Sequence, residues 1–462
     1  MLRLPESVMT ITLADGALLL KHCRYVVTPV PGRYTVRVLE DVDIAIENGI
    51  IVCIGRCRSP GADEIDCRNY VAMPAMGNAH SHAAMSILRG YADDYELFPW
   101  LERIWRAEKL LTPEAVYHAS RIGAIEMAMS GIAALQDMYF YPLETARAAT
   151  EIGLRIRTGP IAGLDPLDLS PYTSLSRTNP LYTPVINLHS LYVPPHEVIE
   201  QVFEMSKNLG IDVHMHVSET REEVFLVRKK YGFFPVEYLY RRGWLSRRCV
   251  LVHLNWLTSW EIDLVAEVGA RGVLCPTSCA KLATGGFAPV YEMMGRGIAL
   301  GLGSDGASAN RFSIAREMLH LVLLYRHNYW DTRIRAEHAL YMATYGSYEA
   351  MSLRGGAIEI GYLGDIVLID LRNPWMFPPI ATRIVSHLVY TLEQSDIVYT
   401  IVGGRVVWSY EMKDRMLKLI EESEKALRPL IDRVEEVRKE LSEAYTDLEP
   451  PEIFRYTLER SS

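Results

Sequence analysis

Eight short β-prone runs, each ending near a polar residue or a proline, constrain the fold of this chain more than any other feature. The runs end near His80, Asp137, Pro160, His189, His216, His253, Pro276 and Asp305. Amphipathic segments of helical length lie between them, including residues 113–129, 195–209, 221–242 and 317–327. A strand followed by a helix and another strand is the pattern of repeated βα units, which form parallel sheets.

The number of units distinguishes between two α/β architectures. Eight parallel units within residues 73–360 favour a closed (β/α)8 TIM-like barrel over an open, doubly wound sheet. Residues 8–72 instead contain short strand-like runs separated by Gly and Pro turns, and residues 364–370 and 398–408 return to that style. We therefore predict a small discontinuous β domain, formed by residues 1–72 and 361–410.

Residues 411–462 form a predicted C-terminal helical extension. Apolar residues recur there at steps of three, four or seven between Met416 and Leu441, as on one face of a helix. Pro429 is expected to kink this helix or to start a second one, which would give a helical hairpin packed on its own subunit.

Metal-binding residue types gather at the predicted strand ends. A lone His80-Ser81-His82 is a weak signal, because histidine also occurs as an ordinary core or surface residue. However, His216 and Asp305 also end β-prone runs, and catalytic groups of a parallel barrel lie at the C-terminal ends of its strands. We expect His80, His82, His216 and Asp305 to bind a divalent metal, which would lower the pKa of a bound water toward about 7.

Two further residues complete the predicted chemistry of a metal hydrolase. Glu219 follows His216 by three residues, just beyond a strand end, where it could shuttle a proton. His253 ends the run Val250–His253 and could orient or polarise the attacking water. Taken alone, Glu219 would be interpreted as a solvated loop acid, and only its place in the set favours a catalytic role. Asp305 is predicted to act in catalysis as well as in metal binding.

Composition excludes other classes of protein. The 462 residues are 49% hydrophobic and 23% charged, with a net charge of -9 and no basic patch, which argues against a nucleic-acid partner. No apolar stretch approaches the roughly 20 residues that cross a bilayer, and the first residues lack the apolar core of a signal peptide. We expect a cytoplasmic enzyme without a membrane partner. The seven cysteines are expected to be free thiols, with disulfides among Cys53, Cys57 and Cys67 as the alternative.

Several stretches, in this order along the chain, resemble the amidohydrolase superfamily. Within it they are similar to the 5'-methylthioadenosine/S-adenosylhomocysteine deaminases, a branch grouped with triazine chlorohydrolases. The likeness runs from about residue 10 to 410. The stretches are Pro74–His82, Leu88–Asp94, Trp100-Leu101, His216–Thr220, Val252–Leu254, Cys275–Ser278 and Leu302–Gly306.

The resemblance implies a barrel with a β-sandwich domain and hydrolytic deamination of an aromatic ring. It places the metal ligands on His80, His82, His216 and Asp305, the proton-shuttling acid on Glu219 and the histidine behind the ligands on His253. It adds three substrate-binding residues to Glu219. His189 contacts the substrate, Trp100 lines the pocket and Glu108 holds ribose hydroxyls.

The resemblance also bears on the cofactor and the assembly. The fourth strand ends in His189 and contains no lysine for a bridge between two metals, so we expect one divalent ion, zinc in preference to iron. The expected partner is a small nucleoside, and the expected assembly is a homo-oligomer, either a dimer or a tetramer.

The chain departs from the family pattern in three places. Cys279 and Ser304 stand where the family usually has Asn and Thr, and residues 158–184 lack clear equivalents of the arginines that meet the carboxylate of S-adenosylhomocysteine. Arg177 is a loose candidate for that role. Alternatives are therefore deamination or dechlorination of another ring, such as guanine, cytosine, a pterin or a triazine. A non-catalytic scaffold is a third interpretation, but such a chain should have lost ligands or the proton shuttle.

Overall fold

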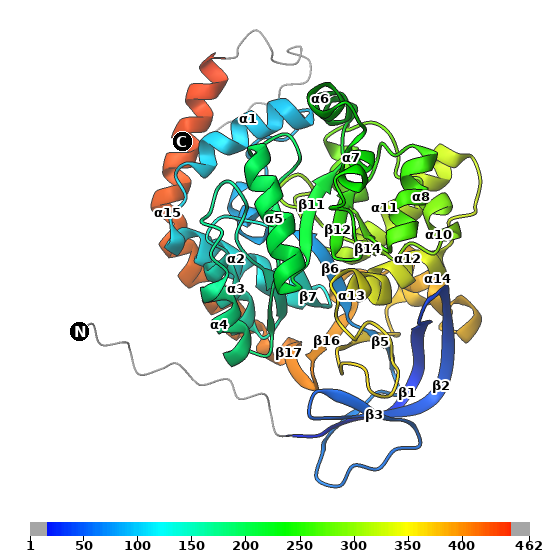
Figure 1. The fold of residues 1–462 in the computed structure, drawn as a ribbon. Coiled ribbons are helices and arrows are strands. Elements are labelled where there is room, and N and C mark those ends of the chain that lie inside the picture. The colour runs from blue at the N-terminus through cyan, green and yellow to red at the C-terminus, as the bar shows by residue number, and fades with distance from the viewer. Residues whose placement is uncertain (1–15, 445–462) are drawn as a thin grey trace, which may run out of the picture.

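The computed structural model describes residues 16–444, and the central part of the chain forms a barrel of parallel strands (Figure 1). The barrel strands are β6 (Met76–Ser81), β7 (Ile132–Asp137), β8 (Arg155–Thr158), β9 (Tyr182–Pro184), β10 (Ile186–Leu188), β11 (Val213–Val217), β12 (Cys249–His253), β13 (Arg271–Leu274) and β14 (Leu300–Leu302). β6 to β9 form one parallel sheet and β10 to β14 another.

Three local connections join the two parallel sheets into a ring. Only Val185 separates β9 from β10, so the two serve as one barrel strand. A parallel bridge between Ile161 and Asn187 links the end of β8 to β10, and another between Ser81 and Asp305 links β6 to the chain just beyond β14. The predicted (β/α)8 fold class is therefore confirmed. The sequence placed three strand ends slightly late, because β8, β13 and β14 end at Thr158, Leu274 and Leu302, two or three residues before Pro160, Pro276 and Asp305.

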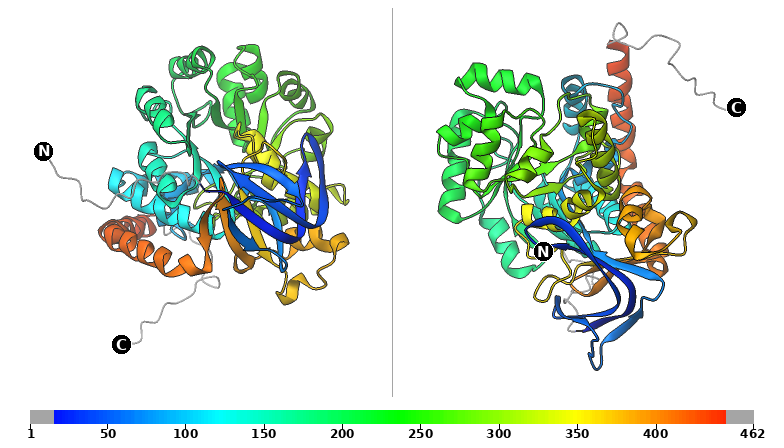
Figure 2. Two further views of the ribbon diagram at one scale, coloured as in Figure 1. Left: turned by 90° about the horizontal axis from the view of Figure 1, so that it is seen from below. Right: turned by 90° about the vertical axis from the view of Figure 1, so that its right-hand side faces the viewer.

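Helices connect the strands and surround the barrel (Figures 1 and 2). They are α1 (Leu97–Glu108), α2 (Pro113–Met129), α3 (Pro142–Ile152), α4 (Ser170–Thr178), α5 (His196–Leu209), α6 (Arg221–Tyr231), α7 (Pro235–Arg241), α8 (Ser259–Val268), α9 (Pro276–Lys281), α10 (Val290–Gly295), α11 (Ile314–Tyr329), α12 (Ala336–Tyr341), α13 (Ser347–Ala350) and α14 (Ala381–Tyr390). Thr112, Thr220, Thr258 and Ser313 each precede a helix and accept a backbone N–H in its first turn.

The segment 221–242 forms two helices rather than the single one suggested by its apolar pattern. Gly232 ends α6 in the left-handed conformation, with φ of 84°, and Pro235 begins α7. A glycine after a helix and a proline in the first turn of the next are the usual signals of such a break.

The terminal segments meet in one sheet of eight strands. These are β1 (Leu18–Val30), β2 (Arg33–Glu47), β3 (Ile50–Gly55), β4 (Asp63–Asp66), β5 (Tyr70–Pro74), β15 (Ile366–Asp370), β16 (Ile397–Val402) and β17 (Arg405–Ser409). The order is β17-β16-β15-β5-β1-β2-β3, with β4 beside β1, and the strongly curved sheet lies against the barrel (Figure 2). This confirms a small discontinuous β domain. Its boundaries at residues 72, 360 and 410 stay predictions, and residues 1–15 lie outside the described residues.

The C-terminal segment forms one continuous helix, α15 (Lys413–Ala444), which packs along α1 and α2 (Figure 1). The expectation of a helical hairpin is wrong for the described residues, because the helix continues through Pro429. Met416 and Leu427 are buried on the N-terminal side of the proline, and Val434 is buried on its C-terminal side. This packing holds α15 in place on both sides of Pro429, which has no backbone N–H to donate within the helix. Residues 445–462 of the predicted extension lie outside the described residues.

Two smaller expectations are also resolved. Cys53 and Cys57 form a disulfide, so the expectation of free thiols is wrong for this pair, whereas Cys67 is free. Among residues 16–444, no helix combines the length and the apolar character needed to cross a membrane.

Candidate active site and metal centre

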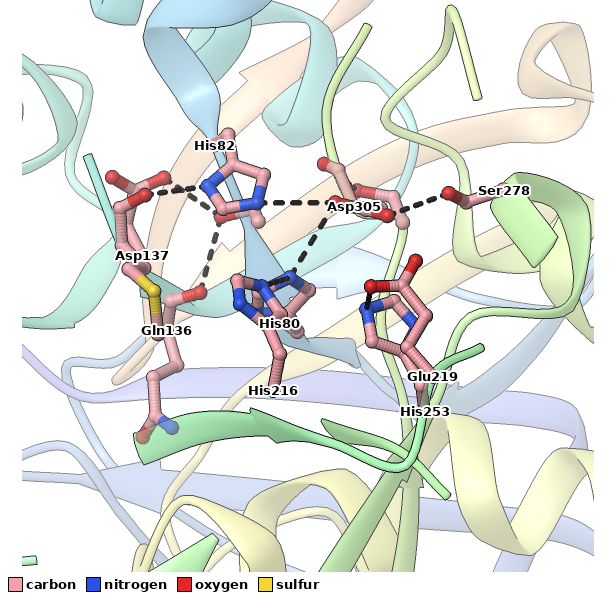
Figure 3. A network of polar contacts seen from close by, with 12 residues as sticks. His80, His82, Gln136, Asp137, His216, Glu219, His253, Ser278 and Asp305 are labelled. Carbon is pink, nitrogen blue, oxygen red and sulfur yellow. Dashed lines mark hydrogen bonds and ion pairs between the residues drawn. The ribbon is translucent and has the colours of Figure 1, made fainter. Parts of the chain in front are cut away.

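The four predicted metal ligands meet at the C-terminal ends of the barrel strands (Figure 3). Asp305 Oδ1 lies 3.4 Å from His80 Nε2 and 3.1 Å from His82 Nε2, and the Nε2 atoms of His80 and His216 are 3.2 Å apart. Two ligands about 2.1 Å from one ion at a tetrahedral angle are about 3.4 Å apart. The spacing of these donor atoms therefore fits a single divalent ion.

The Nδ1 atom of each of these histidines faces a partner other than the metal position. Those of His82 and His216 donate to the carbonyl oxygens of Met138 and His189. His80 Nδ1 lies 3.0 Å from His214 Nε2, and His214 Nδ1 lies 3.0 Å from Asn187 Oδ1.

These contacts fix the positions of the protons. Asn187 Nδ2 donates to two backbone carbonyls, so its Oδ1 is the atom that faces His214 and can only accept. His214 Nδ1 must therefore carry the proton, and His80 Nδ1 donates to the other His214 nitrogen. The Nε2 lone pairs of His80 and His216 consequently face each other at 3.2 Å, an arrangement that a cation between them would stabilise.

Asp305 reaches the histidines because two strands approach closely. A Cβ atom on Gly303 would lie 2.7 Å from His80 Cβ, so only glycine allows the end of β14 to pass this close to β6. The N–H of Asp305 donates to the His80 carbonyl, and Asp305 itself has φ of 58°. Its Oδ2 accepts a 2.6 Å hydrogen bond from Ser278 Oγ, which leaves Oδ1 directed at the histidines.

Glu219 and His253 form the acid–base side of the site. His253 Nε2 lies 3.6 Å from Glu219 Oε2, and both residues are buried (Figure 3). Burial raises the pKa of Glu219 well above its ordinary value, and the negative charges of Asp305 and Glu223 raise it further. Burial also lowers the pKa of His253 to about 3. Burial thus favours the uncharged form of both groups, which leaves Glu219 with a proton to donate and His253 with a nitrogen lone pair that can accept one.

A cavity opens directly over this constellation. His82, His216, Glu219, His253 and Asp305 line it on the metal side. The opposite part is largely apolar and aromatic, with contributions from α1 and from the loops after β7, β8 and β10. Those side chains include Trp100, Leu101, Ile104, Phe140, Ile161, Leu164 and Tyr192. No lysine or arginine is among the described residues that line this cavity, so it offers neither a bridging lysine nor a cation for an anionic substituent.

The structure brings the predicted substrate-binding residues into this same cavity. Trp100 and Glu108 project from α1, and His189 follows β10 directly. Glu108 is only 8% exposed, and burial raises its pKa to about 7, although the hydroxyl of Tyr139 and the charge of His82 act in the opposite direction. Arg177 does not belong to the site, because it lies on α4 and does not line the cavity.

Three supporting residues were missed or left without a role by the sequence analysis. His214 lies two residues before His216, so it shares the inward face of β11, and this alternation was the available signal. Glu223 accepts hydrogen bonds from the N–H groups of Ser218 and Glu219 and so holds the turn after β11. Cys279 lies 3.6 Å from His253 Nδ1, at the position where the family usually has Asn.

Comparison with known proteins identifies the family of this chain. The model of the amidohydrolase family matches residues 71–407. A 5'-deoxyadenosine deaminase of Methanothrix thermoacetophila is 36% identical over 401 residues, which cover 85% of this chain and 96% of that protein. A 5-methylthioadenosine/S-adenosylhomocysteine deaminase of Pyrococcus furiosus is 32% identical over 403 residues, which cover 82% and 96%.

A solved structure shows the same architecture. The crystal structure of an adenosine deaminase from Xanthomonas campestris, with bound zinc, superposes with a TM-score of 0.81 at 28% identity, covering 89% of this chain and 98% of that one. A (β/α)8 barrel with a cluster of histidines and an aspartate at its strand ends defines a metal-dependent hydrolase. This chain belongs to the amidohydrolase family and, like its relatives named deaminases, is a hydrolase that acts on C–N bonds.

Proposed function

We propose that this enzyme removes the 6-amino group of an adenosine-type nucleoside by hydrolysis, giving the inosine analogue and ammonia. The observation that carries the proposal is that one cavity contains both the acid–base pair beside the ligand cluster and the buried carboxyl group of Glu108. The acid–base pair fits hydrolysis at a ring carbon, and the carboxyl group of Glu108 fits hydrogen bonding to the hydroxyls of a ribose. Relatives named for 5'-deoxyadenosine and 5-methylthioadenosine support the same substrate class.

The site residues divide the chemistry among them. His80, His82, His216 and Asp305 would hold one divalent ion, zinc in preference to iron, which when bound would polarise a water molecule and make it a nucleophile near pH 7. Glu219 is the proposed donor of a proton to N1 of the purine. That proton makes C6 more electrophilic.

Proton transfer then completes the reaction. As the water oxygen attacks C6, Asp305 and His253 are proposed to accept its proton. One of the two water protons passes to the amino group, which leaves as ammonia when the C6–N bond breaks, and the other restores the proton that Glu219 gave to N1. The leaving nitrogen therefore gains one hydrogen, and C6 gains the oxygen that becomes the carbonyl of the inosine analogue. His189, at the cavity wall, would help to hold the base, and Trp100 would pack against the nucleoside.

The cavity supports a preference for an uncharged group at the 5' carbon. Its wall is apolar, and no described lysine or arginine faces it. A methylthio group or a hydrogen loses little on entering such a wall, whereas the amino-acid end of S-adenosylhomocysteine carries two charges that would lose water without gaining an ion pair. We therefore rank 5'-methylthioadenosine, 5'-deoxyadenosine and adenosine above S-adenosylhomocysteine.

A side-by-side assay tests the proposal. Ammonia release and the ultraviolet change would be measured for the three nucleosides above, S-adenosylhomocysteine, 2'-deoxyadenosine, adenine, guanine, cytosine, a pterin and a triazine. We expect the highest kcat/KM with one of the three nucleosides and a value at least roughly tenfold lower for S-adenosylhomocysteine. Equal or faster turnover of guanine, cytosine, a pterin or a triazine would refute the nucleoside proposal and favour another ring.

A further inference from the structure

A second cavity lies at the opposite mouth of the barrel, around the N-terminal ends of its strands. Asp212 directly precedes β11, Arg248 directly precedes β12, and Arg271 is the first residue of β13. His216 lies at the other end of β11, four residues beyond Asp212, which corresponds to about 13 Å along the strand. This cavity is therefore separate from the proposed active site.

The charges around this second cavity do not balance. Arg157, Arg247, Arg248 and Arg271 line it, and Asp212 is the only carboxylate among its described lining residues. Four guanidinium groups against one carboxylate leave a formal excess of three positive charges. A further acid nearby, Glu349, does not line the cavity; its carboxyl group interacts electrostatically with Arg271, and its backbone carbonyl accepts a hydrogen bond from the same arginine.

The two inner arginines are deeply buried and share one partner. Arg157 is 3% and Arg271 is 8% exposed, and Asp212 Oδ2 lies 2.8 Å from Arg157 Nη2 and 3.0 Å from Arg271 Nη2. The same oxygen accepts a hydrogen bond from Ser352 Oγ. The Nε atoms of both arginines are buried and have no hydrogen-bond acceptor among the described residues. A buried guanidinium group with unmet donors is costly unless an anion compensates it.

The outer arginines supply an entrance to this inner pair. Arg247 is exposed and Arg248 is half-buried, and neither forms an ion pair within the described residues. The planar guanidinium groups that line this cavity match the oxygens of a phosphate group, which can accept several charge-assisted hydrogen bonds at once.

We propose that this cavity, at the N-terminal mouth of the barrel, binds a small tetrahedral oxyanion of the phosphate type. The bound anion would contact the guanidinium groups of Arg247 and Arg248 at the entrance and approach the buried Arg157 and Arg271 behind them. It would offset the excess positive charge that Asp212 alone leaves. Because it would bind only the folded chain, it would also stabilise the fold.

Calorimetric titration of the intact enzyme with inorganic phosphate tests this site. At 100 mM NaCl we expect saturable binding with a Kd below about 1 mM, weakening at higher salt because exposed charges are screened. The double variant Arg247→Ala/Arg248→Ala should raise the Kd at least about tenfold. The Arg248→Lys variant keeps the positive charge, so its affinity for phosphate should lie between that of the unaltered enzyme and that of the double alanine variant.

Two controls separate binding in this cavity from binding elsewhere on the protein. Arg58→Ala removes an exposed arginine from the loop between β3 and β4 and should leave the affinity unchanged. His216→Ala should also retain phosphate binding, because any anion at the catalytic centre would be lost with its metal ligand. A parallel titration with ribose 5-phosphate shows which kind of ligand the cavity prefers. Tighter binding of inorganic phosphate indicates a site for the free anion, and tighter binding of ribose 5-phosphate indicates a site for a phosphomonoester. Absence of saturable phosphate binding, or its retention by the double alanine variant, would overturn the proposal.

Discussion

Replacing Glu108 with Gln should stabilise the enzyme, and increasingly so as the pH rises. The carboxyl group has a pKa of about 7 in the folded chain because of burial, against an ordinary value of 4.5. Between these two pH values the unfolded chain releases its proton while the folded chain keeps it. Folding is thus progressively disfavoured as pH rises from about 4.5 to about 7, and the loss stays constant above that range.

The size of the effect follows from the shift of the pKa. A difference of about 2.5 pH units corresponds to about 3 kcal/mol at pH 8, and to less than about 1 kcal/mol at pH 5. Gln has nearly the same shape and does not titrate, so Glu108→Gln should relieve this loss. Denaturant unfolding of both proteins at pH 5 and pH 8 measures it. A stabilisation that is equal at the two pH values, or absent at pH 8, would refute the assignment of a buried, titrating carboxyl group.

The same residue should affect substrate choice. An ionised Glu108 can accept hydrogen bonds from two ribose hydroxyls, whereas a shortened side chain offers none. Losing such bonds costs about 1–3 kcal/mol. Glu108→Ala should therefore reduce the preference for adenosine over 2'-deoxyadenosine, measured as the ratio of kcat/KM values. An unchanged ratio would remove Glu108 from ribose recognition.

Three further predictions concern the metal, the proton shuttle and the C-terminal helix. Metal analysis should find one ion per chain, and two stoichiometric ions at the site would contradict a mononuclear centre. The His216→Ala variant should lose metal and activity together, whereas the control variant His327→Ala, at an exposed position, should keep both. Glu219→Gln should keep its metal but lose about 100- to 10,000-fold in kcat, and near-normal turnover would exclude Glu219 from the mechanism. Truncation after Trp408 removes α15 and exposes the surfaces of α1 and α2 beneath it, so it should lower the melting temperature. Size-exclusion chromatography of the full chain tests the predicted dimer or tetramer.

The fold could be predicted from the sequence because strand ends and helices in a barrel alternate with a regular, local pattern. The helix break at Gly232 and Pro235 carries a local signal too, since a glycine and a proline at this spacing mark the end of one helix and the start of another. Pro429 is different. Its local signal favours a break, and only the packing of α15 on α1 and α2 overrides it. Such long-range packing is absent from local sequence patterns.

The candidate site shows the same division between local and long-range information. Strand-end position identified the residues whose donor atoms converge, because a barrel brings all its C-terminal strand ends together. It did not identify which nitrogen of each histidine faces the proposed metal position. That choice depends on Asn187 directing His214, on His214 directing His80, and on the carbonyls behind His82 and His216. Two of these partners are backbone carbonyls, whose positions cannot be inferred from a sequence motif. The tautomer of each histidine is therefore set by the fold.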